Sequence, residues 1–254
     1  MRKLGILGLG HMGMAIAKGA AGTIGKDAVA GYDPSSEKRT AGEALGIEIA
    51  DSVSALCRTA HIVLVAVRPQ DIEGLLNELK TAHPQCLLTI AAGIPIRRYT
   101  DALGPLPVIR AMPNTPLQLG EGAVALCRNE LCSEEDFRFA IELFRSMGTA
   151  CEISEDHMCD IIAVNGSSPA FIYLFAKGFI DYAASVGIDS AAATELFTQS
   201  LRFFNGFLAV AGGRHNNIVG PVKDGRVGMF DATGFPSAHR VCRDELDIFS
   251  QYLL

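Results

Sequence analysis

The beginning of the chain, up to Asp33, constrains the fold more than any other stretch. A short apolar run, Leu4 to Leu7, is long enough for a buried strand and leads directly into the glycine turn 8–13, GLGHMG. A helical pattern follows over 14–20, and a second apolar run, 28–32, ends on Asp33. A strand, a GxGxxG turn, a helix, a strand and an acid in this order are typical of a βαβ unit that binds a dinucleotide.

Each glycine of this turn has an expected function. Gly8 permits the tight turn, Gly10 lets backbone N–H groups approach a pyrophosphate, and Gly13 lets the helix pack closely on the strand. The helix N-terminus offers unpaired donors and a partial positive charge to the phosphates. Asp33 is expected to accept hydrogen bonds from an adenosine ribose. The expected cofactor contacts of this unit are Gly8, Gly10, His11, Met12, Gly13 and Asp33. A glycine-rich turn without a ligand is the alternative interpretation.

Short apolar runs alternate with helical segments through the first 153 residues. This alternation predicts a doubly wound, mostly parallel sheet. After Ser154 the strand-like runs vanish and the periodicity becomes helical. The sequence therefore predicts an α/β dinucleotide-binding domain over 1–153 and an all-α domain over 154–254. The helices expected in the second domain cover 155–164, 169–186, 189–210 and 237–253.

Composition narrows the possible partners. Hydrophobic residues make up 49% of the chain and the mean hydropathy is +0.25, which suggests either a large subunit interface or a membrane protein. Since no apolar run approaches the roughly 18 residues of a spanning helix, we expect the interface and no membrane association. The net charge of −6 and the absence of a Lys/Arg block argue against a nucleic-acid partner.

The cysteines favour a reducing compartment. There are seven, without a CxxC pair, which fits a cytoplasmic protein. The start of the chain superficially resembles a signal peptide, but cleavage there would destroy the first strand and the glycine turn. Cys151, His157 and Cys159 lie close in sequence, but a metal needs three or four convergent ligands. We therefore expect buried thiols there and no metal.

Three of the expected strands end in unusual turns, at 67–69, 91–93 and 112–116. In open α/β sheets ligands bind beyond the carboxyl ends of the strands. Small residues and prolines at these ends would let a flat ring lie against the backbone, and an asparagine amide would face it. Each of these segments, taken singly, is equally well explained as an ordinary turn formed by glycine or proline. Together, on the edge that carries the glycine turn, they favour a nicotinamide pocket. Its candidate residues are Ala66, Val67, Arg68, Pro69, Ala92, Gly93, Met112 and Asn114.

A further turn precedes the expected helix 169–186. Asn165, Ser167 and Ser168 stand just before or at its N-terminus, followed by Pro169. Backbone N–H groups and two hydroxyls there would suit a substrate carboxylate. An ordinary serine cap followed by a proline is the alternative interpretation.

These segments together resemble pyrroline-5-carboxylate reductase over residues 1 to about 190. The resemblance implies a Rossmann-like domain followed by a helical domain that interlocks with a second subunit as a homodimer. It also implies the reduction of a cyclic imine, 1-pyrroline-5-carboxylate, to proline by hydride from NAD(P)H. The segments that carry it are GLGHMG (8–13), AVRP (66–69), IAAG (90–93), RAMPNTP (110–116) and GSSPA (166–170).

Two positions depart from the family pattern. Arg68-Pro69 stands where the family commonly has lysine-proline. More importantly, the family has a Ser-Pro-Gly-Gly-Thr-Thr loop that helps to hold the substrate, whereas this chain shows a shortened Pro221–Gly228 segment without it. The resemblance therefore applies to the cofactor-binding half of the chain, and it does not identify the imino-acid substrate. No lysine or histidine stands at a motif position as an obvious catalytic residue, so the catalytic residues are unknown.

Two other functions remain open. The β-hydroxyacid dehydrogenases share the architecture and place a lysine about four residues after a Gly-rich helix start, where this helix offers Tyr173 and Lys177. A non-catalytic NAD(P)-binding regulatory dimer is also compatible with the missing loop.

The cofactor choice is finely balanced. Asp33 should repel a 2′-phosphate and favour NADH. Against this, Ser35, Ser36, Lys38 and Arg39 follow closely and would bind a 2′-phosphate if Asp33 turned away. We expect NADH to be slightly favoured over NADPH.

The helical domain carries an apolar surface that a twin subunit is expected to cover. Its members recur at helical spacing and are Phe171, Ile172, Phe175, Phe179, Phe197, Leu201, Phe204 and Leu208.

Overall fold

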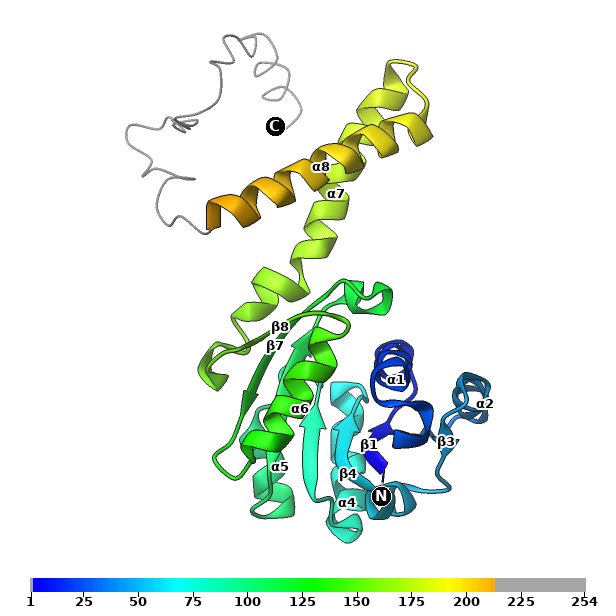
Figure 1. The fold of residues 1–254 in the computed structure, drawn as a ribbon, viewed down its shortest axis with the longest axis vertical. Helices are drawn as coiled ribbons and strands as arrows, with labels where there is room; N and C mark the ends of the chain where they lie inside the picture. The colour runs from blue at the N-terminus through cyan, green and yellow to red at the C-terminus, as the bar shows by residue number, and fades with distance from the viewer. Residues whose placement is uncertain (1, 213–254) are drawn as a thin grey trace. The chain divides into compact units, whose positions relative to one another are not determined.

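The structure, a computed structural model, describes the backbone of residues 2–212 and the side chains of residues 4–202. Within this part of the chain the strands form one eight-stranded sheet in the order β3-β2-β1-β4-β5-β6-β7-β8 (Figure 1). Neighbouring strands are parallel except β6 and β7, which are antiparallel. The predicted doubly wound, mostly parallel sheet is thus confirmed. Its strands are Arg2–Leu7 (β1), Val29–Tyr32 (β2), Glu48–Ile49 (β3), Ala60–Val65 (β4), Cys86–Thr89 (β5), Val108–Pro113 (β6), Gly122–Arg128 (β7) and Gly148–Glu152 (β8).

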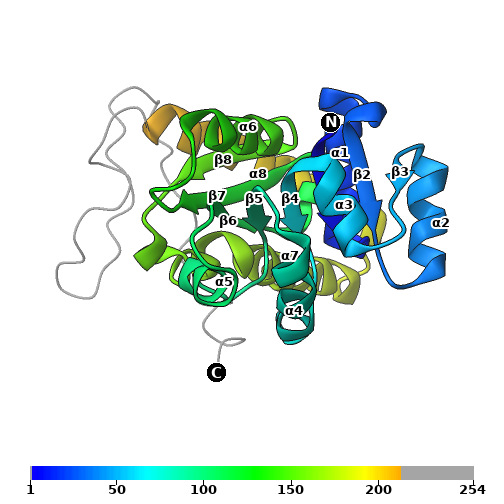
Figure 2. The ribbon, with the colours of Figure 1, turned by 90° about the horizontal axis from the view of Figure 1, so that it is seen from below.

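Helices cover both faces of the sheet because its central strands are apolar on both sides. Residues of α1 and α6 pack with one face in one hydrophobic cluster, and residues of α3, α4 and α5 pack with the other face in a second cluster. Figure 2 shows α6 on one side of the sheet and α4 and α5 on the other. The helices are His11–Ile24 (α1), Ser36–Leu45 (α2), Val53–Thr59 (α3), Ile72–Ala82 (α4), Ile96–Leu103 (α5) and Glu134–Arg145 (α6).

Local sequence signals fix several helix ends. The Ser52 hydroxyl accepts a hydrogen bond from the Ala55 N–H at 3.1 Å, and the Ser133 hydroxyl accepts one from the Asp136 N–H at 3.0 Å. Both are N-caps, which satisfy donors that the first helical turn leaves unpaired. α2 ends at Gly46, which takes the left-handed conformation favoured by glycine.

The predicted helix over 155–164 is wrong. The chain instead forms a 3₁₀ turn at Glu155–His157 and a π-helical turn at Ile162–Gly166. The π turn closes when the Ser167 N–H donates to the Ile162 carbonyl at 2.8 Å, one residue wider than an α-helical bond. Two long helices follow, as predicted: α7 over Ser168–Ser185 and α8 over Ser190–Gly212.

Contacts divide the chain into two compact units between Phe175 and Ala176, within α7. In the second unit the rings of Phe179 and Phe197 stack with centroids 4.8 Å apart. Of the other apolar residues expected to meet a second subunit, Phe171 is 66% exposed, while the side chains of Phe204 and Leu208 lie outside the described residues. The segments 221–228 and 237–253 also lie outside them.

The cysteines fall into two groups. Burial raises the pKa of Cys57 to about 11 and that of Cys127 to about 12, so these thiols stay protonated in the core. Cys151 and Cys159 are exposed, so the expectation that they are buried thiols is wrong. Cys151 lies on β8, at the edge of the sheet, and Cys159 lies in the turn after it. In the described part of the chain no three metal-binding side chains converge, and no helix there is long and apolar enough to cross a bilayer.

Candidate active site

The glycine turn lies at the carboxyl end of β1 and is shaped by two close approaches. Gly8 has φ +97°, and a Cβ there would lie 2.6 Å from the Ala66 carbonyl oxygen. A Cβ on Gly13 would lie 1.9 Å from the Gly8 carbonyl oxygen. Neither position accepts a larger residue without moving the backbone. The tight turn and the close approach of α1 expected from the sequence are both present.

Gly10 differs from the other two glycines because it faces open space. It is the N-cap of α1, makes no side-chain cap, and a Cβ there would meet no atom within 4 Å. The first turn of α1 carries no acidic residue, and His11 at its start is exposed. Unpaired N–H groups, a helix dipole and free space fit a pyrophosphate at this position.

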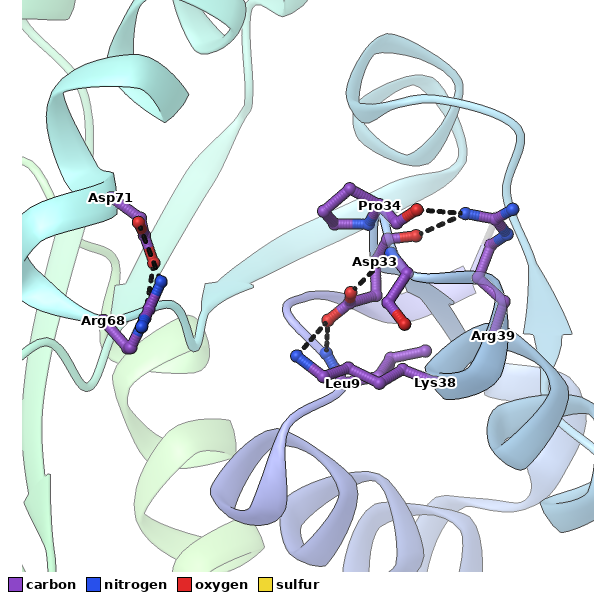
Figure 3. A network of polar contacts seen from close by, with 8 residues as sticks. Leu9, Asp33, Pro34, Lys38, Arg39, Arg68 and Asp71 are labelled. Carbon is purple, nitrogen blue, oxygen red and sulfur yellow. Dashed lines mark hydrogen bonds and ion pairs between the residues drawn. The ribbon is translucent and has the colours of Figure 1, made fainter.

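Asp33 directly follows β2, and its carboxylate points toward the glycine turn (Figure 3). The residue is 3% exposed. Its Oδ2 accepts a hydrogen bond from the Leu9 N–H at 2.8 Å, and its Oδ1 accepts one from the Ser35 N–H at 2.9 Å. The sequence had placed Asp33 for ribose contacts and gave no indication of this bond to Leu9. A carboxylate has about four acceptor positions, so two remain for a ligand.

Two basic residues surround Asp33. The Lys38 ammonium lies 3.5 Å from Asp33 Oδ2, with the lysine side chain 48% exposed. The Arg39 guanidinium donates to the carbonyls of Asp33 and Pro34 at 2.8 and 2.9 Å. The carboxylate is therefore partly neutralised, and two cations stand where β2 ends (Figure 3).

A third cation, Arg68, follows the carboxyl end of β4. The Arg68 guanidinium donates from Nε to Asp71 Oδ2 at 2.9 Å, as Figure 3 shows, and its side chain is 73% exposed. Pro69 is also exposed, while Ala66 and Val67 are partly buried against β1 and its turn. At the end of β5, Ala92 and Gly93 are exposed, and Gly93 has φ +75°. These residues lie on the same edge of the parallel strands as the glycine turn.

Met112 and Asn114, expected near the nicotinamide, are buried. Met112 is 5% exposed and lies in the second hydrophobic cluster. Asn114 Oδ1 accepts from the Ala123 N–H at 2.8 Å, and its Nδ2 donates to the Asn165 carbonyl at 3.2 Å. The Asn114 amide is thus used within the protein.

Asn165, expected to touch substrate, is also held by the protein. Its Nδ2 donates to the carbonyls of Met112 at 2.9 Å and Ala123 at 3.0 Å. These two acceptors fix the orientation of the amide, because the opposite orientation would set its oxygen against both carbonyls. Its Oδ1 is buried and has no hydrogen-bond partner among the described residues. A buried acceptor without a partner costs about 1–3 kcal/mol of folding free energy.

Ser167 and Ser168 follow at the start of α7. Both are partly exposed, and Pro169 occupies the second position of the helix. Their hydroxyls make no recorded hydrogen bond to the described residues, so both are free to meet a ligand.

Arg110, on β6, is a buried arginine. The sequence shows it as part of the RAMPNTP motif and predicts no function for it. The Arg110 side chain is 2% exposed, and its Nη1 lies 3.4 Å from Glu155 Oε1. The same Glu155 oxygen accepts the Ile96 N–H at 2.7 Å, at the N-terminus of α5. Arg110 Nε has no hydrogen-bond partner among the described residues. Glu155 thereby joins β6, α5 and the segment that leads to Ser167.

Two family models match the chain in separate regions. The model described as NADP oxidoreductase, coenzyme F420-dependent, matches residues 3–93. The model described as pyrroline-5-carboxylate reductase dimerisation matches residues 155–215. The first match contains the glycine turn, and the second contains Asn165, Ser167 and Ser168.

Individual relatives agree with both matches. Pyrroline-5-carboxylate reductase of Methanosarcina acetivorans is 31% identical over 79% of this chain and 76% of its own length. The crystal structure of 1-pyrroline-5-carboxylate reductase from Streptococcus pyogenes is 33% identical, with a TM-score of 0.75 over 82% of this chain and 79% of that one. The Plasmodium falciparum enzyme, solved with NADP bound, is 29% identical, with a TM-score of 0.74 over 87% of this chain and 85% of that one.

The identity, the coverage and the shared two-part architecture agree with the segments that carried the resemblance. The chain belongs to the pyrroline-5-carboxylate reductase family, NAD(P)H-dependent oxidoreductases that act on a CH–NH bond and form proline from 1-pyrroline-5-carboxylate.

Proposed function

We propose that the carboxyl edge of the sheet holds the cofactor from the glycine turn to the ends of β4 and β5. The open space at Gly10 and the unpaired N–H groups of α1 receive the pyrophosphate. Arg68 and the basic residues after Asp33 flank the adenosine end. The exposed turn at Ala92 and Gly93 supports the nicotinamide. The observation that carries this placement is the space at Gly10, next to two glycines whose surroundings leave none.

The substrate carboxylate is proposed to bind at Ser167 and Ser168. Their free hydroxyls and the N-terminus of α7 form an anion site close to the strand ends. When bound, reduced nicotinamide supplies a hydride from its C4 to the imine carbon. An iminium substrate is already protonated and electrophilic, so the protein mainly orients the substrate and excludes water.

A serine substitution tests the substrate site. Ser168→Ala should raise KM for pyrroline-5-carboxylate severalfold, because a hydroxyl contact is worth about 0.5–1.5 kcal/mol. The Kd for NADH, measured by fluorescence titration, should stay unchanged. Ser185→Ala, on the same helix and far along it, serves as the control. Wild-type KM in a Ser167→Ala, Ser168→Ala double variant would show that the substrate binds elsewhere.

The cofactor preference rests on Asp33 and its basic neighbours. The expected slight preference for NADH stays a proposal. The Asp33 carboxylate supports this preference because it keeps two acceptor positions. The Lys38 ammonium, 3.5 Å from Asp33 Oδ2, argues against it. A severalfold higher kcat/KM with NADPH would overturn it.

We also propose that the pocket is more open than in relatives that have the Ser-Pro-Gly-Gly-Thr-Thr loop. The segment 221–228 carries no pair of threonine hydroxyls to replace it. Lost contacts of this kind usually lower kcat. We therefore expect slow turnover of pyrroline-5-carboxylate, or faster turnover of a bulkier cyclic imino acid. Rates against a panel of cyclic imines test this, and oxidation of a 3-hydroxy acid would support a β-hydroxyacid dehydrogenase instead.

The remaining proposals concern organisation. The dinucleotide-binding domain is proposed to cover 1–153 and the helical domain 154–254, with the protein acting as a homodimer in the cytoplasm. Exposed apolar side chains on α7, such as Phe171 and Leu174, support an interface because patches of this kind are rarely left open. A stable monomer in sedimentation at micromolar concentration would contradict the dimer.

A further inference from the structure

Asn114 and Asn165 meet at the point where β6 ends and β7 begins. The antiparallel ladder runs as far as Pro113 opposite Val124, and Pro113 has no N–H to donate. Beyond Pro113, asparagine side chains make the hydrogen bonds in place of the backbone ladder. The Asn114 Oδ1 accepts from the Ala123 N–H, and the Asn165 Nδ2 donates to the Ala123 carbonyl. Asn165 also binds the Met112 carbonyl, and Asn114 binds the Asn165 carbonyl.

We propose that these two asparagines are a positioning pair, which sets the substrate anchor at a fixed distance and angle from the nicotinamide. The inference rests on the proposed substrate site at Ser167 and Ser168. Asn114 follows the strand at the cofactor edge, and Asn165 stands two residues before Ser167. Neither side chain needs to touch a ligand.

The connection is local and specific. Among the described residues, the recorded side-chain hydrogen bonds that join the π turn 162–166 to the ends of β6 and β7 all involve Asn114 or Asn165. Asn114 is 8% exposed and Asn165 9%, so water does not compete for these bonds. π turns are rare, and they frequently lie at functional sites. Here it directs the Asn165 amide toward the ends of the strands, and α7 begins at Ser168, directly after Ser167.

Hydride transfer gives such a connection a function. The reacting atoms must approach to about 3–3.5 Å, and a displacement of about 1 Å costs about 100-fold in rate. The cofactor binds to the strand ends and the substrate carboxylate to the turn at 165–168. Each half keeps its ligand without the pair, but their mutual placement depends on it.

The experiment compares Asn114→Ala, Asn165→Ala and the double variant with a matched control. Asn129 supplies the control, because it makes the same kind of bonds away from the site. Its Oδ1 accepts from the Val108 N–H at 3.1 Å, and its Nδ2 donates to the Leu106 carbonyl at 2.9 Å. Asn129→Ala loses two comparable bonds and should keep wild-type kcat per folded active site.

We expect kcat to fall about tenfold or more in each single variant of the pair, while the Kd for NADPH stays within about twofold. The kcat of the double variant should be scarcely lower than that of the less active single variant, because the two residues act as one unit. The isotope effect on kcat with NADPH deuterated at the transferred position should rise, since hydride transfer becomes slower. A purely structural role would move none of these beyond the Asn129→Ala control.

Asn114→Asp provides a second test that keeps the side-chain volume if an alanine variant fails to fold. It keeps the acceptor for the Ala123 N–H, but it replaces the donor to the Asn165 carbonyl with a carboxylate oxygen and adds a negative charge. It should show the same fall in kcat and rise in isotope effect. Wild-type kcat and isotope effect in a folded Asn114→Asp or Asn165→Ala variant would overturn the proposal. Absence of imine turnover by the wild-type chain would instead contradict the proposed function.

Discussion

The Asp33 carboxylate accepts a hydrogen bond from the Leu9 N–H at 2.8 Å, so the residue that follows β2 holds the glycine turn that follows β1. A charge-assisted bond of this kind is stronger than one between neutral groups. At 3% exposure it is also shielded from water. Asp33 therefore holds the turn that is proposed to bind the pyrophosphate, in addition to its proposed contact with the ribose.

Substitution of Asp33 should separate these two effects. Asp33→Ala removes the bond to Leu9 and the negative charge, so affinity for both cofactors should fall, with the larger fall for NADH. Asp33→Asn keeps an acceptor for the Leu9 N–H without the charge, and it should shift preference toward NADPH with a smaller loss of affinity. Kd values for NADH and NADPH measure both effects. An unchanged preference in both variants would exclude a role for the Asp33 charge in cofactor choice.

Gly10 and Gly13 should respond differently to the same substitution. Gly10→Val has room in the folded protein, so the variant should fold but should bind NAD(P)H at least about 1–2 kcal/mol more weakly, because a side chain blocks the phosphates. Gly13→Val places a Cβ against the Gly8 carbonyl and should lower the unfolding temperature sharply. Fluorescence titration and thermal unfolding of both variants provide the comparison. A folded Gly10→Val protein with wild-type cofactor affinity would refute the pyrophosphate site.

The fold was predictable where a segment's own pattern decides its structure. The β-branched run that includes β4, the serine cap at Ser133 and the glycine turn each carry their signal within a few residues. The π turn at 162–166 was not predictable, because the Asn165 amide within it donates hydrogen bonds to strand carbonyls 42 and 53 residues earlier. The same limit applies to the site. The sequence located its edge, but it could not show that the amides of Asn114 and Asn165 are occupied by one another and by the strand ends.

His61 should make stability depend on pH. Burial lowers its pKa, but hydrogen bonds to Gln85 and Asp136 and the charges of Asp136 and Glu135 outweigh this, so the pKa is raised above 6.5. A raised histidine pKa stabilises the fold fully below about pH 6.5, and this contribution is lost as pH rises through the folded pKa. The His61 side chain is 42% exposed, so the contribution should stay below about 1 kcal/mol.

The comparison with His61→Gln isolates this contribution. Wild type should exceed the variant in unfolding temperature at pH 6, and the difference should shrink by pH 8. A difference that is constant or larger at pH 8 would contradict the assigned role of the Asp136 contact.

His83 offers a test of backbone strain. It ends α4 with φ +49°, the only positive φ of a non-glycine residue in the described part of the chain. The left-handed conformation costs a residue with a Cβ about 1–2 kcal/mol, and glycine pays a smaller entropic cost. His83→Gly should therefore stabilise the protein by about 0.5–1 kcal/mol, whereas His83→Ala should not. Urea midpoints at constant slope measure both, and a His83→Gly midpoint at or below that of His83→Ala would contradict the strain.

Imine-dependent oxidation of the reduced cofactor tests the central claim most directly. The purified chain is mixed with NADH or NADPH and 1-pyrroline-5-carboxylate, and absorbance loss is followed together with proline formation. Hydride transfer at the carboxyl edge predicts saturable oxidation that requires the imine and yields one proline per cofactor oxidised. A folded protein that binds NAD(P)H but shows no oxidation with this or any other cyclic imino acid would contradict it.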